Sequence, residues 1–130
     1  MPKEIISTQD APQPIVPLSQ AVRANGFVFV SGMVSRDPAT GQVVGSGITE
    51  QAERMLENVK AVLHAAGTTL DHAVRATCYL KRKEDFPAFN EVYRRYFPKD
   101  PPARALLQVD FVLPGVLCEI EVTAIMPGRE

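Results

Sequence analysis

The fold is decided by residues 49–81, which read TEQAERMLENVKAVLHAAGTTLDHAVRATCYLK. From Ala52 onward, apolar residues recur at spacings of three and four, and this period predicts an amphipathic helix over 49–67. After Gly67 the period changes to two, because apolar and polar residues alternate over 72–81, and this predicts a strand. A helix that leads directly into a strand indicates a mixed α and β domain.

The ends of the helices are marked by residues suited to those positions. Thr49 is expected to cap the first N–H groups of the helix over 49–67, and Gly67 is expected to end it in the left-handed conformation. A second helix is expected over 85–97, capped by Asp85, because apolar and aromatic residues again keep helical spacing there. Pro98 prevents its continuation.

Strands are expected on both sides of this central region. Over 20–34, Asn25-Gly26 separates two apolar runs, which is the strongest short signal of a β-hairpin. Residues 35–47 are rich in turn residues and are expected to form a loop with a short extension at its centre. Beyond Pro101-Pro102, alternating segments over 103–113 and 116–126 are joined by Pro114-Gly115, which predicts a second hairpin.

The order of these elements is hairpin, helix, strand, helix, hairpin. It predicts an α+β fold with two helices on one face of a mixed, mainly antiparallel sheet, and residues 1–130 are expected to form a single domain. Because a chain of this length has nothing else with which to cover the second sheet face, an oligomer with sites at subunit boundaries is expected.

The composition excludes some classes of function. Of the 130 residues, 45% are hydrophobic and 22% charged, as in ordinary globular proteins. Fourteen basic residues against fifteen acidic ones give a net charge of −1, which provides no attraction for nucleic acid or an anionic membrane. The first residues lack the apolar stretch of a signal peptide, and no apolar run reaches membrane-spanning length, so a cytoplasmic location is expected.

Several reactive residue types lack a pattern that would give them a role. Cys78 and Cys118 stand far apart among apolar residues and are expected to be buried, protonated thiols. His64 and His72 have no metal-ligand spacing. Ser31 lacks both the Gly-x-Ser-x-Gly elbow and a nearby histidine, which disfavours nucleophilic hydrolysis.

Arg104 is the first candidate for a functional residue. It follows Pro101-Pro102-Ala103 and begins an apolar strand, where the planar guanidinium could bind a carboxylate through two hydrogen bonds with little screening by water. The alternative is an arginine at a sheet edge that forms a salt bridge or covers apolar surface with its stem.

Glu119 and Glu121 form the second candidate. In the segment Cys118-Glu119-Ile120-Glu121-Val122 the strand period places both carboxylates on one sheet face and the apolar side chains on the other. A glutamate shielded from water would have a raised pKa and could exchange protons with a water molecule that attacks an imine carbon. The alternative is a face that is simply solvated.

The chain from Ala11 onward resembles the RidA/YjgF family of enamine/imine deaminases. The resemblance rests on the order and spacing of several short motifs. These are Ala11-Pro12, Pro17, Val30-Ser31-Gly32, Asn58-Val59-Lys60-Ala61-Val62-Leu63, Ala65-Ala66-Gly67, Asp85-Phe86, Phe89-Asn90-Glu91-Val92-Tyr93, Pro102-Ala103-Arg104 and Glu119-Ile120-Glu121.

The resemblance implies a chorismate-mutase-like fold, a homotrimer, and clefts between subunits where reactive 2-imino acids lose ammonia. It implies no cofactor and no metal. By position, Arg104 would bind the substrate carboxylate and Glu119 would orient or activate water. Ser31 and Asn90 would line or support the cleft.

The chain departs from the family pattern at two places around the expected pocket. Typical deaminases of the family have Gly-Pro-Tyr where this chain has Val16-Pro17-Leu18, and Arg-Ser-Cys where it has Arg104-Ala105-Leu106. Leu18 and Leu106 are expected to line the substrate pocket and to make it more apolar, with Leu106 on the same strand face as Arg104.

The leading expectation is therefore hydrolysis of an enamino or imino acid to a 2-oxo acid and ammonia, with 2-aminomuconate or aminoacrylate deaminase as a pathway-specific variant. A non-catalytic, carboxylate-binding or regulatory trimer is the alternative. Ribonuclease activity fits poorly, because the sequence shows neither a basic patch nor a pair of histidines for acid–base chemistry.

Overall fold

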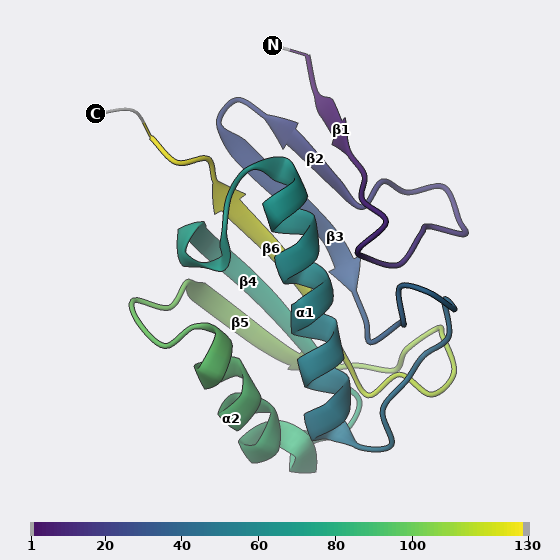
Figure 1. Cartoon of the computed structure of the whole chain (residues 1–130). Coiled ribbons are helices and arrows are strands. Elements are labelled where there is room, and N and C mark those ends of the chain that lie inside the picture. Colours follow the sequence, from purple (N-terminus) through teal and green to yellow (C-terminus); the bar gives the residue numbers. More distant parts are fainter. Residues whose placement is uncertain (1, 129–130) are drawn as a thin grey trace.

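The computed structural model describes residues 2–128, which form one six-stranded sheet and two helices (Figure 1). The strands are β1 (Glu4–Ile6), β2 (Ala21–Ala24), β3 (Phe27–Met33), β4 (Ala73–Leu80), β5 (Ala103–Gln108) and β6 (Cys118–Ile125). The helices are α1 (Ile48–Ala66) and α2 (Phe86–Tyr96), and 3-10 turns form at Leu70–His72 and Lys83–Asp85. The sheet order is β1-β2-β3-β6-β4-β5, and only β4 and β5 run parallel. The predicted α+β class and mainly antiparallel sheet are confirmed.

The first predicted hairpin is confirmed as β2 and β3. Ala24 lies opposite Phe27, and Asn25 and Gly26 form the two-residue turn between them with φ angles of 52° and 82°. Positive φ at both positions is the condition for the turn type that matches the twist of antiparallel strands. Within the following loop, a single bridge between Arg36 and Val43 is the short extension that was predicted.

Helix α1 has the predicted extent, but its N-terminus is capped differently from the prediction. The N-cap is Gly47, and no side chain caps the helix there, so the role predicted for Thr49 is wrong. Glu50 instead accepts a hydrogen bond from the Ser46 backbone N–H at 2.9 Å, which places a carboxylate at the positive end of the helix dipole. At the other end Gly67 has a φ of 93°, as predicted.

Helix α2 is also confirmed, with Asp85 at the N-cap position. The Asp85 side chain makes no capping hydrogen bond; its carboxylate accepts one from Arg82 Nε at 3.4 Å. Pro87 lies in the first turn, where its missing N–H has no consequence.

The predicted second hairpin is wrong. Strand β5 ends at Gln108 and pairs with β4 in parallel, while β6 pairs with β3 and β4, so β4 lies between the two strands expected to be neighbours. The chain from β4 to β5 crosses over through α2, which is the long connection that parallel strands require. Residues 109–117 then form a loop that returns the chain to the centre of the sheet.

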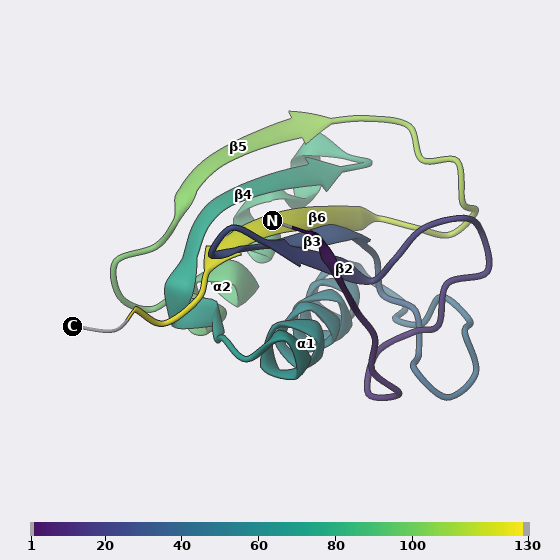
Figure 2. The same ribbon diagram turned by 90° about the horizontal axis from the view of Figure 1, so that it is seen from above.

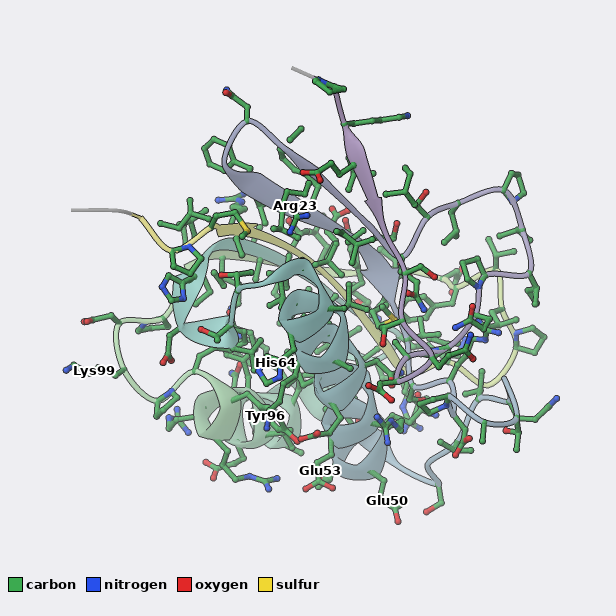
Figure 3. The ribbon with its side chains drawn as sticks, turned by 45° about the horizontal axis from the view of Figure 1, so that its top comes forward. Arg23, Glu50, Glu53, His64, Tyr96 and Lys99 are labelled. Carbon is green, nitrogen blue, oxygen red and sulfur yellow. The ribbon has the colours of Figure 1, made fainter. Side chains whose placement is uncertain are left out.

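Both helices cover the same sheet face, as the view from above shows (Figure 2). The core lies between them and the sheet, where Met55, Leu63, Phe89 and Ile120 are fully buried. Two polar contacts join the helices near the labelled Glu53 and Tyr96 (Figure 3). Arg95 donates to Glu53 at 2.8 Å, and the Tyr96 hydroxyl donates to Glu57 at 2.7 Å.

The opposite sheet face is bare in Figure 2. By strand alternation and register, Phe27, Phe29, Leu107 and Ile125 project from it, and all four side chains are exposed. An uncovered face with several large apolar side chains is typical of an interaction surface. Within residues 2–128, neither helix combines the length and apolar character that crossing a membrane requires.

Candidate active site

Strand β6 places Glu119 and Glu121 on the bare face of the sheet. Cys118 and Ile120 are fully buried on the helix-covered face, which confirms the alternation expected from the sequence. Glu119 and Glu121 line a pocket of about 440 Å³ between the sheet and the loop over 109–117. Its other lining residues are Gly32, Val34, Tyr79, Val109, Asp110, Phe111, Val112, Leu113 and Val116.

Gly32 in β3 makes room for the Glu119 carboxylate. A Cβ atom at residue 32 would lie 2.1 Å from Glu119 Oε2, which is closer than any two such atoms can approach. Only glycine therefore allows the carboxylate to lie against β3. Burial raises the pKa of Glu119, and the neighbouring charge of Glu121 raises it further.

Tyr79 in β4 adds a hydroxyl to this pocket, beside the two glutamates of β6. It lies directly opposite Glu119 in the register, but its hydroxyl donates to Glu121 Oε1 at 2.9 Å. The hydrogen bond to Glu121 is the main cause of a raised pKa of the Tyr79 hydroxyl. Glu119 is left without a side-chain hydrogen bond among the described residues, so its carboxylate is available to a ligand or to water.

Arg104 lies on the other side of the sheet, at the edge formed by β5 and α2. Its guanidinium carbon is 4.7 Å from the centre of the Tyr93 ring, and its Nη1 donates to Asn90 Oδ1 at 2.9 Å. Both partners belong to α2, so the helix holds the guanidinium from two directions. Among residues 2–128 Arg104 has no carboxylate partner, unlike the salt-bridged edge arginine considered as the alternative.

The guanidinium of Arg104 opens into a second pocket, of about 310 Å³. Its lining residues are Asn90, Tyr93, Arg94, Phe97, Pro101, Pro102 and Arg104. A guanidinium that is held in place but has no anionic partner is well suited to bind a small carboxylate.

The other residues expected in the site fall into different surroundings. Leu18 and Ser31 line a small cavity of about 80 Å³ that shares Gly32 and Val34 with the Glu119 pocket. The Ser31 hydroxyl donates to the Ser19 carbonyl at 2.6 Å, which ties β3 to the segment that carries Leu18. Leu106 shares the strand face of Arg104, as expected, but it packs against the hydrophobic core.

Within one chain, Arg104 and Glu119 cannot act on the same small molecule. Arg104 pairs with Ala76 and Glu119 with Tyr79, three residues farther along β4, which is about 10 Å along the strand. Strands β5 and β6 lie on either side of β4 and are themselves about 10 Å apart. The two side chains also project from opposite faces of the sheet.

Tyr79, Tyr93 and the steric role of Gly32 were not anticipated from the sequence. Tyr93 is buried, as the helical spacing of aromatic residues over 85–97 predicts, but its ring also supports Arg104. Its hydroxyl has no hydrogen-bond partner among the described residues, and burial raises its pKa to about 12. No sequence signal identifies these roles, because each depends on a residue from another strand or helix.

The two cysteines have the surroundings that were expected. Cys78 and Cys118 are both fully buried on the helix-covered face, as free thiols. Burial raises the pKa of each thiol to about 12, so both are protonated near neutral pH and unreactive.

Comparisons with known proteins agree with this fold. The family pattern described as endoribonuclease L-PSP matches residues 8–126. A RutC family protein of Saccharolobus solfataricus is 50% identical over 122 residues, which cover 94% of this chain and 97% of that protein. The 2-iminobutanoate/2-iminopropanoate deaminase of Capra hircus is 42% identical over 123 residues, covering 95% of this chain and 90% of the deaminase.

A solved structure has the same arrangement of strands and helices. The crystal structure of E. coli TdcF with bound serine superposes with a TM-score of 0.90 at 35% identity, covering 95% of this chain and 99% of that one. Because the family pattern spans nearly all of the described residues and the relatives match over almost their full length, the chain belongs to the RidA/YjgF family, also described as endoribonuclease L-PSP.

Proposed function

We propose that the protein hydrolyses 2-imino acids, and the enamino acids that tautomerise to them, into 2-oxo acids and ammonia. The observation that carries the proposal is the guanidinium of Arg104, which Asn90 and Tyr93 hold at the edge of a pocket without an anionic partner among residues 2–128. The 42% identity to an imine deaminase supports this choice of substrate class.

In the proposed reaction, Arg104 binds the substrate carboxylate through charge-assisted hydrogen bonds and so fixes the neighbouring imine carbon. Glu119 takes a proton from a water molecule while the water oxygen attacks that carbon, and the electron pair of the C=N bond moves to nitrogen. Glu119 returns that proton to the nitrogen, and the remaining hydroxyl proton also passes to nitrogen as the C=O bond forms and the C–N bond breaks. One water is consumed and one ammonia leaves. Glu119 suits both proton transfers, because its pKa is raised toward neutral pH, where a carboxyl can both accept and donate a proton.

The site is proposed to form between subunits. Since Arg104 and Glu119 project from opposite faces of one sheet, Arg104 of one copy would act with Glu119 of a neighbouring copy. The exposed apolar side chains of the bare face, among them Phe29 and Leu107, offer the surface for that contact. We propose a homotrimer of single-domain chains with no cofactor.

Leu18 and Leu106 bear on which acid is used. Leu18 contributes apolar surface beside the Glu119 pocket, and no hydroxyl takes its place there. We therefore expect substrates with apolar side chains to be preferred over small polar ones.

A carboxylate-binding protein without turnover is the second candidate. It is favoured by the related TdcF structure, which contains bound serine, an amino acid with a carboxylate and no imine. Both candidates need Arg104, but only the deaminase needs Glu119.

The test measures ammonia release from a freshly generated 2-imino acid, above the spontaneous rate in water. We expect turnover by the wild type and a loss of at least about 30-fold in kcat/KM for Arg104→Ala, since hydrogen bonds to charged groups contribute about 2 kcal/mol or more. Arg82→Ala is the matched control, because Arg82 is an exposed arginine that lines neither pocket.

The comparison is made at equal oligomeric mass, determined by light scattering. If the wild type binds serine or a 2-oxo acid in calorimetry, loses that binding in Arg104→Ala, and releases no ammonia, the binding-only candidate is correct. Turnover that is equal in the wild type and Arg104→Ala would contradict both candidates.

A further inference from the structure

Two side chains beside Glu119 have no role in the reaction as proposed above. Tyr79 lies directly opposite Glu119 in the register. Its hydroxyl nevertheless donates its hydrogen bond to Glu121 Oε1, 2.9 Å away, and not to Glu119. Glu121 lies two residues from Glu119 on the same strand face. Of the two carboxylates that β6 brings to this pocket, Glu121 is thus held by a donor and Glu119 is without one.

We propose that Tyr79 and Glu121 are positioning residues for Glu119: the Tyr79 hydroxyl holds the Glu121 carboxylate in a fixed place beside Glu119, so that Glu119 is the free carboxyl that transfers the proton. The proposal deepens the deaminase function and rests on it for the catalytic consequence.

The asymmetry of the two carboxyls follows from their contacts. The hydrogen bond from the Tyr79 hydroxyl fixes the position of the Glu121 carboxylate beside Glu119. A fixed negative charge at Glu121 disfavours a second negative charge at Glu119. In agreement, the pKa of Glu119 is raised by burial and then by Glu121, and the pKa of Tyr79 is raised chiefly by its bond to Glu121, so Tyr79 keeps its proton and remains the donor.

The rest of the pocket does not offset this effect. From β3 the neighbour of Glu119 is Gly32, which brings no charge. The loop over 109–117 contributes Asp110, another acid. Among the described residues that line the pocket there is no lysine, arginine or histidine, so Glu121 is the neighbour whose charge Glu119 experiences most directly.

An alternative role for the Tyr79–Glu121 bond is ordinary cross-strand stabilisation between β4 and β6. The two roles differ in what they predict for Glu119. Stabilisation alone leaves the titration of Glu119 unchanged when the bond is removed, whereas positioning requires it to shift.

The experiment titrates the carboxyl carbons of 13C-labelled glutamate by NMR in the full-length protein, with Glu119→Gln and Glu121→Gln spectra used for assignment. In Glu121→Gln we expect the pKa of Glu119 to fall, because a neighbouring negative charge is lost. In Tyr79→Phe we expect the pKa of Glu119 to fall as well, because the Glu121 carboxylate loses its donor and is no longer held beside Glu119. Glu53→Gln, which changes an exposed glutamate on α1, should leave Glu119 unaffected.

The same variants are then compared in the pH profile of kcat/KM for ammonia release. The limb of the pH profile that reports the titration of Glu119 is the one that disappears in Glu119→Gln. In Glu121→Gln this limb should move to lower pH, by the same shift that NMR measures for Glu119. An unchanged Glu119 titration in both Tyr79→Phe and Glu121→Gln, with folding intact by circular dichroism, would overturn the positioning role even if the enzyme turns over. Conversely, if the Glu119 titration shifts in these variants but the protein releases no ammonia, the positioning role of Tyr79 and Glu121 is supported and the deaminase function is contradicted.

Discussion

At the scale of single residues, Gly32 is a position where an added Cβ atom would displace the Glu119 carboxylate. It lies in a strand, where glycine ordinarily weakens packing, and the close approach of the Glu119 carboxylate explains why it is tolerated. The absence of a side chain at residue 32 therefore sets where the Glu119 carboxylate can lie.

We predict that Gly32→Ala lowers kcat/KM for ammonia release about tenfold or more, because the new Cβ would lie 2.1 Å from Glu119 Oε2 and the carboxylate must move away. Steady-state kinetics with circular dichroism as a folding check tests this. Gly47→Ala is the control, since a Cβ at residue 47 meets nothing within 4 Å and the φ of −148° suits any residue. Equal activity of the two variants would show that Glu119 does not need its observed position.

At the scale of elements, Gln51 ties the first turn of α1 to the loop that leads into β6. Its side chain is 2% exposed. Its amide nitrogen donates to the carbonyls of Gly45 and Gly115 at 3.2 and 2.9 Å, and its oxygen accepts from the Leu117 N–H at 2.8 Å. One buried amide thus satisfies backbone groups from two loops. The last of these groups belongs to Leu117, two residues before Glu119 in the chain.

We predict that Gln51→Met lowers the free energy of unfolding by about 2 kcal/mol, because a side chain of similar size leaves three partly buried backbone groups without their hydrogen-bond partner. Urea unfolding at one fixed protein concentration measures the change. Gln42→Met, at an exposed position on the neighbouring loop, is expected to stay within about 0.5 kcal/mol of the wild type. A loss no larger than that of the control would mean that water replaces Gln51 without cost.

At the scale of the whole molecule, the bare sheet face is the feature that the fold leaves unexplained. Helices α1 and α2 lie on one side, and the apolar side chains of the other side are 38% to 47% exposed at Phe27, Phe29, Leu107 and Ile125 (Figure 2). A second copy on this face would bury them and would bring a foreign surface to the Glu119 pocket. The proposed trimer and the proposed shared site are therefore one hypothesis.

We predict that Phe29→Lys shifts the protein to monomers in light scattering and reduces ammonia release to the spontaneous rate, because a charge would have to be buried in the interface. Phe86→Lys is the control: Phe86 is similarly exposed, at 42%, but begins α2 on the other side of the sheet. A monomer with full activity would contradict the shared site, and an unchanged oligomer would show that subunits meet elsewhere.

The sequence by itself determined the local structure and identified the candidate residues for the chemistry. The period of α1, the Asn25-Gly26 turn, and the alternation that places Glu119 opposite the buried face of β6 are all set by residues near one another in the chain. Arg104 could be singled out for the same reason, as a charge at the start of an apolar strand.

Only the tertiary structure decided which segments became neighbours. Alternation states which side of a strand is buried but not which strand lies beside it, so β5 was expected beside β6 and is instead parallel to β4. The three-residue β1 is too short to show any period, and was not expected at all. The contact of Gly32 with Glu119, the bond of Tyr79 to Glu121, and the placement of Arg104 on the opposite face each join distant segments. These depend on how the whole chain buries its apolar surface, which no local pattern encodes.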